Sequence, residues 1–193
     1  MGISFEFRMV ESLQDFHRTG EYLHGQDLGY PRYHGWVDKT IHDIASGKKR
    51  AIIGLSNGII VGNIVYRMNG DVPGLVDVRN MRIHPALRNR YFAKFMHKQV
   101  EIEAKNAGQY GLICDVREDR PDLARFMIGS LGYSQLFNQP INLYEEGKRD
   151  IVLVKFFKET VEESKGIIHL AKNKLFTAGQ NLINMPENLS LAA

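Results

Sequence analysis

A strand, a helix and a second strand follow one another closely between Val76 and Val116. The run from Val76 to Ile83 has the β-branched, apolar character of a strand, and Leu112 to Val116 repeats that pattern. Between them, apolar residues recur at the spacing of one helix face: Phe92, Phe95, Met96 and Val100. Two strands joined by a crossover helix pair in parallel. This segment therefore predicts an α/β fold that contains a parallel strand pair.

The first third of the chain predicts antiparallel strands and two helices. Residues 3–10 alternate apolar and polar side chains, as a half-buried strand does. Apolar runs at 50–55 and 59–67 flank Asn57-Gly58, a strong signal for a tight hairpin. Helices are expected over about 13–24, after a cap at Ser12, and over about 33–45.

The remainder of the chain predicts one more helix, two more strands and a helical tail. Asp119 and Pro121 open a helix that Gly132 closes, and strands are expected at 133–137 and 151–157. We expect a mixed α/β sheet of about seven strands, with helices on both faces, over residues 1–158. Residues 159–193 form a predicted helical extension that docks on its own domain or forms a homodimer with a twin subunit.

Charge and cysteine content exclude several functional classes. A net charge of +3 over 193 residues, without a basic stripe, argues against a nucleic-acid-binding protein. The single cysteine, Cys114, allows neither an internal disulfide nor a cysteine-based zinc cage, and the histidines show no metal-ligand spacing. No apolar run reaches membrane-spanning length, and the N-terminus lacks a signal-peptide core. A cytoplasmic protein without a bound metal is expected.

Positive charge is concentrated on the strand-turn-helix segment, at Arg79, Arg82, Arg88, Arg90, Lys94 and Lys98. A helix N-terminus exposes N–H groups that have no partner within the helix, together with the positive end of the helix dipole, so it favours phosphate. Two interpretations fit this pattern: a site for an anionic ligand, or a solvated helix face.

The turn itself resembles a known cofactor loop. His84-Pro85 followed by Arg88-Asn89-Arg90-Tyr91-Phe92-Ala93 is similar to the pyrophosphate loop of the GNAT superfamily of acetyl-CoA-dependent N-acetyltransferases, written Arg/Gln-x-x-Gly-x-Gly/Ala. Leu131-Gly132-Tyr133 and residues 150–155 are similar to later elements of that family. The resemblance covers about residues 3–158. It implies transfer of an acetyl group from acetyl-CoA to a primary amine of a small molecule or a protein.

The resemblance also assigns cofactor contacts. The backbone of Met81, Arg82 and Ile83 would pair with the pantetheine arm of coenzyme A. Backbone amides from one continuous stretch would hold the pyrophosphate: Arg88, Asn89, Arg90, Tyr91, Phe92 and Ala93.

The same resemblance suggests the catalytic groups. A lysine-like amine, with a pKa of about 10.4, is almost entirely protonated at pH 7 and needs a base. Asp77 stands where family members often carry a glutamate, although it could equally be a solvated strand residue paired with an arginine. Tyr133 and Cys114 are candidate proton donors to the leaving thiolate, and each could instead be a core residue.

Two positions depart from the family pattern. Tyr91 replaces the first loop glycine, and Ile128 stands where many members carry a tyrosine acid. These departures favour, as an alternative, a catalytically degenerate module that binds acyl-CoA or a protein partner.

The aromatic-rich segment between the first two helices is a candidate acceptor site. Its residues Tyr30, Tyr33, His34 and Trp36 either bind the acceptor or pack the second helix. A third possibility for the chain, suggested by the basic residues from Arg79 to Lys98, is acetylation of aminoacyl-tRNA.

Overall fold

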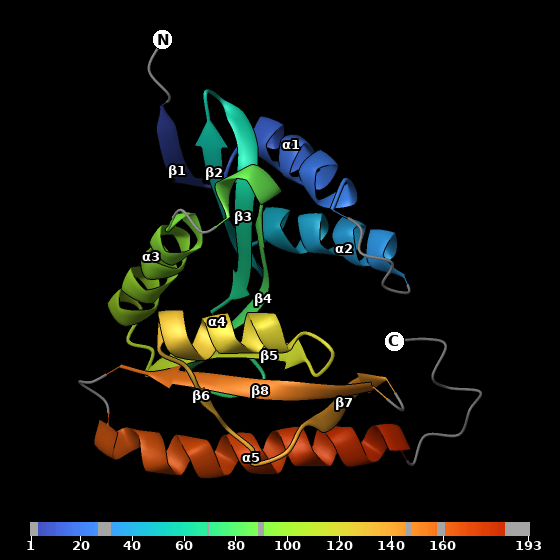
Figure 1. Ribbon diagram of the computed structural model, residues 1–193, viewed down its shortest axis with the longest axis vertical. Coiled ribbons are helices and arrows are strands. Elements are labelled where there is room, and N and C mark those ends of the chain that lie inside the picture. The colour runs from blue at the N-terminus through green and yellow to red at the C-terminus, as the bar shows by residue number, and fades with distance from the viewer. Residues whose placement is uncertain are drawn as a thin grey trace. The chain divides into compact units, whose positions relative to one another are not determined.

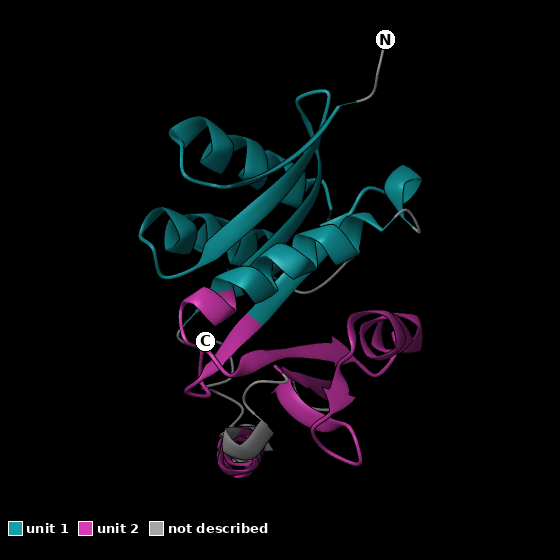
Figure 2. Cartoon of the chain, turned by 90° about the vertical axis from the view of Figure 1, so that its left-hand side faces the viewer, with its two compact units in different colours: residues 1–68, 78–103 teal, residues 69–77, 104–193 magenta. Residues whose placement is uncertain are grey.

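The computed structural model describes residues 4–26, 32–68, 70–88, 91–145, 148–157 and 161–183. These residues form two compact units: residues 1–68 with 78–103, and residues 69–77 with 104–193 (Figure 2). Strand β4, Leu75–Ile83, contributes residues to both units. The strand order of the described sheet is β1-β2-β3-β4-β5-β8-β6, with β7 paired to β8.

The first unit is built on an antiparallel meander. Its strands are β1 (Phe5–Met9), β2 (Arg50–Ser56), β3 (Ile59–Arg67) and the end of β4. Helices α1 (Leu13–His24) and α2 (Tyr33–Ala45) cover one face, and α3 (Phe92–Asn106) covers the other (Figure 1). Alternate β2 residues, Ala51, Ile53 and Leu55, pack into the core beneath α1 and α2.

Local signals set the ends of these elements. The Ser12 side chain accepts a hydrogen bond from the Asp15 N–H at 3.1 Å, which caps α1. Asn57 and Gly58 both have positive φ angles, 48° and 77°, as the two-residue hairpin between β2 and β3 requires. The expected helices and hairpin of this region are therefore present.

The second unit contains the parallel pair that the strand-helix-strand segment predicts. Leu75–Asp77 of β4 pair in parallel with Gly111–Ile113 of β5 (Gly111–Arg117). All of β5 pairs antiparallel with β8 (Lys148–Phe156), which also pairs with β6 (Ser134–Gln135) and β7 (Ile141–Glu145).

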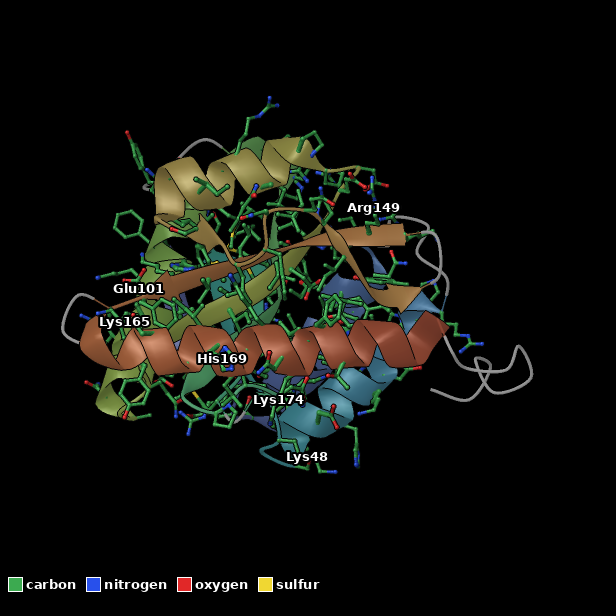
Figure 3. The ribbon with its side chains drawn as sticks, turned by 90° about the horizontal axis from the view of Figure 1, so that it is seen from below. Lys48, Glu101, Arg149, Lys165, His169 and Lys174 are labelled. Carbon is green, nitrogen blue, oxygen red and sulfur yellow. The ribbon has the colours of Figure 1, made fainter. Side chains whose placement is uncertain are left out.

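Helices α4 (Pro121–Leu131) and α5 (Val161–Ile183) lie on opposite faces of the β5–β8 strands (Figure 1). On α5, Ala171 is fully buried in a core with Leu75, Ile113 and Val154. Lys174, on the same helix (Figure 3), donates from Nζ to the carbonyl of Asp71 at 3.0 Å. Helix α5, the described part of the helical extension, thus packs on strands of its own chain.

Two details differ from the sequence expectation. The strand expected at 133–137 is a two-residue pairing, and β7 adds a strand, so the described sheet has eight. The expected boundary between residues 158 and 159 lies outside the described residues and stays a prediction. None of the described helices is long and apolar enough to cross a membrane.

Candidate functional site

The junction between β4 and α3 turns the chain sharply from strand to helix. The N–H of His84 donates to the carbonyl of Val61 at 2.8 Å, so β4 stays attached to β3 at its end. The His84 ring accepts a hydrogen bond from the N–H of Ala86 at 3.3 Å and so caps a short 3-10 helix, η1 (Pro85–Leu87). Arg88 then folds back, because its Nε donates to the carbonyl of Ile83 at 3.2 Å.

The first turn of α3 presents backbone N–H groups without helical acceptors. The N–H of Phe95 donates to the carbonyl of Tyr91 at 3.0 Å. The amides of Phe92, Ala93 and Lys94 precede that bond and therefore have no acceptor within the helix. With the positive end of the helix dipole, they suit an anionic group such as a pyrophosphate. Asn89 and Arg90, expected to take part, lie outside the described residues.

Tyr91 adopts a left-handed backbone conformation, which glycine takes more readily than any other residue. Its φ angle is 61°, in the left-handed region that costs a non-glycine residue about 1 kcal/mol. The ring is 68% exposed, and the Lys94 ammonium lies 5.3 Å from its centroid. The turn therefore keeps a glycine-like backbone path, and the bulky side chain lies in solvent.

The guanidinium groups of Arg82 and Arg88 flank this turn, and neither has a carboxylate partner among the described residues. Burial raises the pKa of Tyr22, on α1, to about 12, and the positive charges of Arg82 and Arg88 act in the opposite direction. The hydroxyl of Tyr22 and Nε of Arg82 are both buried without a hydrogen-bond partner among the described residues. Unsatisfied buried donors beside unpaired positive charges fit a negatively charged ligand.

Two glycines, one on β2 and one on β3, leave space for side chains of α3 and of the end of β4. A Cβ at Gly54 would lie 2.9 Å from Cζ of Phe92, the first residue of α3. A Cβ at Gly62 would lie 2.9 Å from Cδ1 of Ile83 and 3.2 Å from the Met96 sulfur. The position of the turn thus depends on the absence of side chains on β2 and β3.

Asp77, the predicted base, is at the end of the parallel ladder in the second unit. It pairs in register with Ile113, and its side chain is buried, with 5% of the residue exposed. The residue is therefore not solvated, whereas its pairing with an arginine and its role as a base both stay predictions. The close approach of Gly70, whose Cβ would lie 3.0 Å from Cβ of Asp77, encloses it further.

The two candidate proton donors contact each other near Asp77. The Cys114 thiol and the Tyr133 side chain form a hydrogen bond, and both residues are buried. Burial raises the pKa of Cys114 well above its ordinary value, and the carboxylates of Asp115 and Asp77 raise it further. The thiol is thus protonated at neutral pH and is a poor nucleophile.

The end of α4 fixes the position of Tyr133. Gly132 closes the helix with a φ angle of 76°, and the N–H of Tyr133 donates to the carbonyl of Met127 at 3.2 Å. Lys155 donates to the carbonyl of Leu131 at 2.5 Å and so satisfies another carbonyl at the same C-terminal end of the helix. Ile128, which stands where the family acid is expected, is 37% exposed on α4.

The expected acceptor residues separate into different environments. Tyr33 is buried in a core with Leu23 and Val37, and its hydroxyl donates to the Leu23 carbonyl at 2.9 Å. Trp36 stacks on Tyr33 at 5.8 Å between centroids, while the Lys49 ammonium lies 5.8 Å from the Trp36 ring. These contacts are those of packing residues, and the acceptor-binding role of Tyr33 and Trp36 stays a prediction.

His34 belongs to a polar cluster between α1 and α2 that the sequence did not reveal. Its Nδ1 lies 2.9 Å from Nδ1 of His24, whose Nε2 lies 3.0 Å from an Asp38 carboxylate oxygen. The four-residue spacing of His34 and Asp38 places both on one helix face, but their meeting with His24 depends on how the two helices cross. Tyr30 lies outside the described residues.

Solved structures share this fold at low sequence identity. A structure described as a GNAT-family acetyltransferase from Desulfovibrio desulfuricans aligns with a TM-score of 0.67 and 13% identity, over 79% of this chain and 99% of that one. The ribosomal-protein-S18-alanine N-acetyltransferase of Escherichia coli aligns with a TM-score of 0.59 and 15% identity, over 78% and 92%. The PaiA N-acetyltransferase of Thermoplasma acidophilum, solved with coenzyme A, aligns with a TM-score of 0.58 and 12% identity, over 80% and 99%.

No protein-family model and no curated protein sequence matches this chain. The structural likenesses nevertheless show that the chain has the GNAT fold, as the sequence resemblance predicted. Acetyltransferases solved with acetyl-CoA or coenzyme A are among the proteins with this fold.

Proposed function

We propose that this chain is an N-acetyltransferase that transfers an acetyl group from acetyl-CoA to a primary amine. The observation that carries the proposal is the β4–α3 junction, where a left-handed residue, Tyr91, leads directly into the unpaired amides of the first turn of α3. These amides suit the pyrophosphate, and Arg82 and Arg88 supply positive charge beside them. Acetyl-CoA, when bound, supplies the activated acetyl thioester.

In this proposal Asp77 prepares the acceptor. It takes a proton from the ammonium group, directly or through water, so that the amine becomes a nucleophile. Its burial removes competing solvent from the carboxylate. Tyr133 returns a proton to the departing thiolate, and its hydrogen bond with the Cys114 thiol holds the hydroxyl in place.

The first experiment separates binding from turnover. We expect acetyl-CoA to raise the melting temperature of the protein and thiol to be released with at least one member of a panel of primary amines. Asp77→Asn should lower kcat by about a hundredfold or more without weakening coenzyme A binding. Asp122→Asn, a change of a fully exposed carboxylate in the same unit, is the matched control.

A second experiment tests the cofactor contacts. Arg88→Gln should weaken coenzyme A binding about tenfold, because a charge-assisted contact with phosphate is lost. Arg149, labelled in Figure 3, carries an equal charge but is already paired with Glu118, so Arg149→Gln should leave the affinity unchanged. Equal affinities of both variants and the wild type would contradict the assignment of the junction.

One observation favours a second candidate, a module that binds acyl-CoA without turnover. Ile128 cannot donate a proton from the place where the family acid is expected. Coenzyme A binding without thiol release across the amine panel would support this candidate. Acetylation of aminoacyl-tRNA is the third proposal, and it requires salt-dependent association with tRNA.

A further inference from the structure

Strand β1 is the outer strand of the described sheet, and one of its edges has no partner strand (Figure 1). The N–H of Val10 donates to the Ala51 carbonyl at 2.9 Å, and the N–H of Asn57 donates to the Ser4 carbonyl at 3.1 Å. Even-numbered backbone groups of this strand therefore face β2. Because backbone groups alternate along a strand, the N–H and C=O groups at positions 5, 7 and 9 point outward.

We propose that this edge pairs with the same edge of a second copy of the chain, antiparallel and centred on Phe7. In that register Phe7 lies opposite Phe7 of the second copy, and Phe5 lies opposite Met9. The outward N–H and C=O groups at positions 5, 7 and 9 then all find partners across the two-fold axis.

The charges of β1 select this register. Glu6 and Arg8 lie on the same face, and Arg8 Nη1 is 3.4 Å from the Glu6 carboxylate. With the axis at Phe7, Glu6 of each copy lies directly opposite Arg8 of the other. An axis at Glu6 or at Arg8 would instead place like charges directly opposite each other, which is unfavourable in a sheet. Of these three registers, only the one centred on Phe7 places opposite charges against each other.

The exposed aromatic side chains beside this edge also favour a second copy of the chain as the partner. Phe5 and Phe95 are 49% and 61% exposed, although they belong to a cluster of rings with Phe7 and Phe92. Phe5 and Phe7 point to the α3 face, since they contact rings of that helix. In the proposed register, Met9 of the second copy lies against Phe5 and covers its exposed side. Apolar residues of this size are seldom left together at an edge.

Sedimentation velocity over a range of concentrations tests the assembly. We expect the full-length chain to form a dimer, and Glu6→Arg to raise its dissociation constant about tenfold or more, because two attractive pairs become repulsive. Glu11→Arg makes the same charge change on an exposed residue outside the strand and should not alter the dimer. Phe176→Glu changes an exposed residue of α5 and should also have no effect.

Amide hydrogen exchange of the wild-type chain tests the register without any substitution. The amides of Phe5, Phe7 and Met9 should become protected as concentration rises, whereas those of Glu6 and Arg8 should be protected at every concentration. A monomer at all concentrations would overturn the proposal. So would a dimer that Phe176→Glu disrupts and Glu6→Arg leaves intact, or protection at positions 5, 7 and 9 that does not depend on concentration.

Discussion

The ring of Phe92 occupies the space beside Gly54 that any side chain would need. A Cβ at Gly54 would lie 2.9 Å from Cζ of Phe92 and 3.2 Å from Cε1 of Phe7. Phe92, the first residue of α3, can therefore pack against β2 only because residue 54 has no Cβ. Because α3 begins there, this contact also positions the amides proposed to bind pyrophosphate.

Gly54→Ala should lower the free energy of unfolding by about 1–3 kcal/mol, since rings from two elements must move to admit the methyl group. Gly35→Ala is the matched control, because a Cβ there meets nothing within 4 Å and Gly35 lies in α2. It should raise the free energy of unfolding by about 0.5–1 kcal/mol. Urea unfolding followed by circular dichroism measures both, and equal effects would contradict the packing argument.

Tyr91→Gly should strengthen coenzyme A binding several-fold. Glycine removes the ring from the start of α3, which frees space for the ligand; because Tyr91 is already left-handed without ligand, relief of the backbone cost adds to stability and leaves the affinity unchanged. Tyr91→Ala removes the ring but keeps most of the backbone cost, so it separates the two effects. Isothermal titration calorimetry measures the affinities. A rise for Tyr91→Ala as large as for Tyr91→Gly would assign the effect to the ring alone.

Local signals in the sequence predicted most of the fold. Ser12, Asn57-Gly58 and Gly132 act within a few residues of their own positions, so the elements that they delimit could be placed without the structure. Strand β7 was missed although it neighbours β8 in the sequence, with Glu145 opposite Lys148, because it has only five residues; of these, Leu143 is buried in the core. Strand pairing of this kind leaves only a weak local pattern.

The candidate site was less predictable than the fold. Intrinsic preference argues against a left-handed tyrosine, so the backbone of Tyr91 could not be inferred from its residue type. The contact of Cys114 with Tyr133 joins β5 to the second residue after α4, and the pairing of His24 with His34 joins two helices. Each depends on packing between elements that are separate in the sequence.

Tyr133→Phe should lower kcat about a hundredfold and leave the affinity for coenzyme A unchanged, if its hydroxyl supplies the proton of the leaving group. Tyr144→Phe removes another hydroxyl of the same unit, one that donates to the Asp115 carboxylate at 2.7 Å, and should retain activity. Steady-state kinetics with the best amine substrate compares the two variants. Full activity of Tyr133→Phe would show that Tyr133 is a core residue without a catalytic role.

Asp150 makes the protein less stable as the pH rises from about 4 to 6. Burial raises the pKa of Asp150 from 3.8 to about 6, and the neighbouring carboxylate of Asp115 adds to the effect. Between these values the unfolded chain loses the proton while the folded chain keeps it, so the free energy of unfolding falls. This decrease in the free energy of unfolding amounts to about 3 kcal/mol, and it is fully present above pH 6.

Asp150→Asn should therefore raise the free energy of unfolding at pH 7 by up to about 3 kcal/mol and have little effect at pH 4. The asparagine oxygen can still accept the backbone hydrogen bond from Leu143. Asp122→Asn provides the contrast, because Arg120 lowers the pKa of that exposed carboxylate and its removal should give no stabilisation at pH 7. Denaturant unfolding at several pH values measures the difference. A pH profile between 4 and 6 that is as steep in Asp150→Asn as in the wild type would assign the effect to another group.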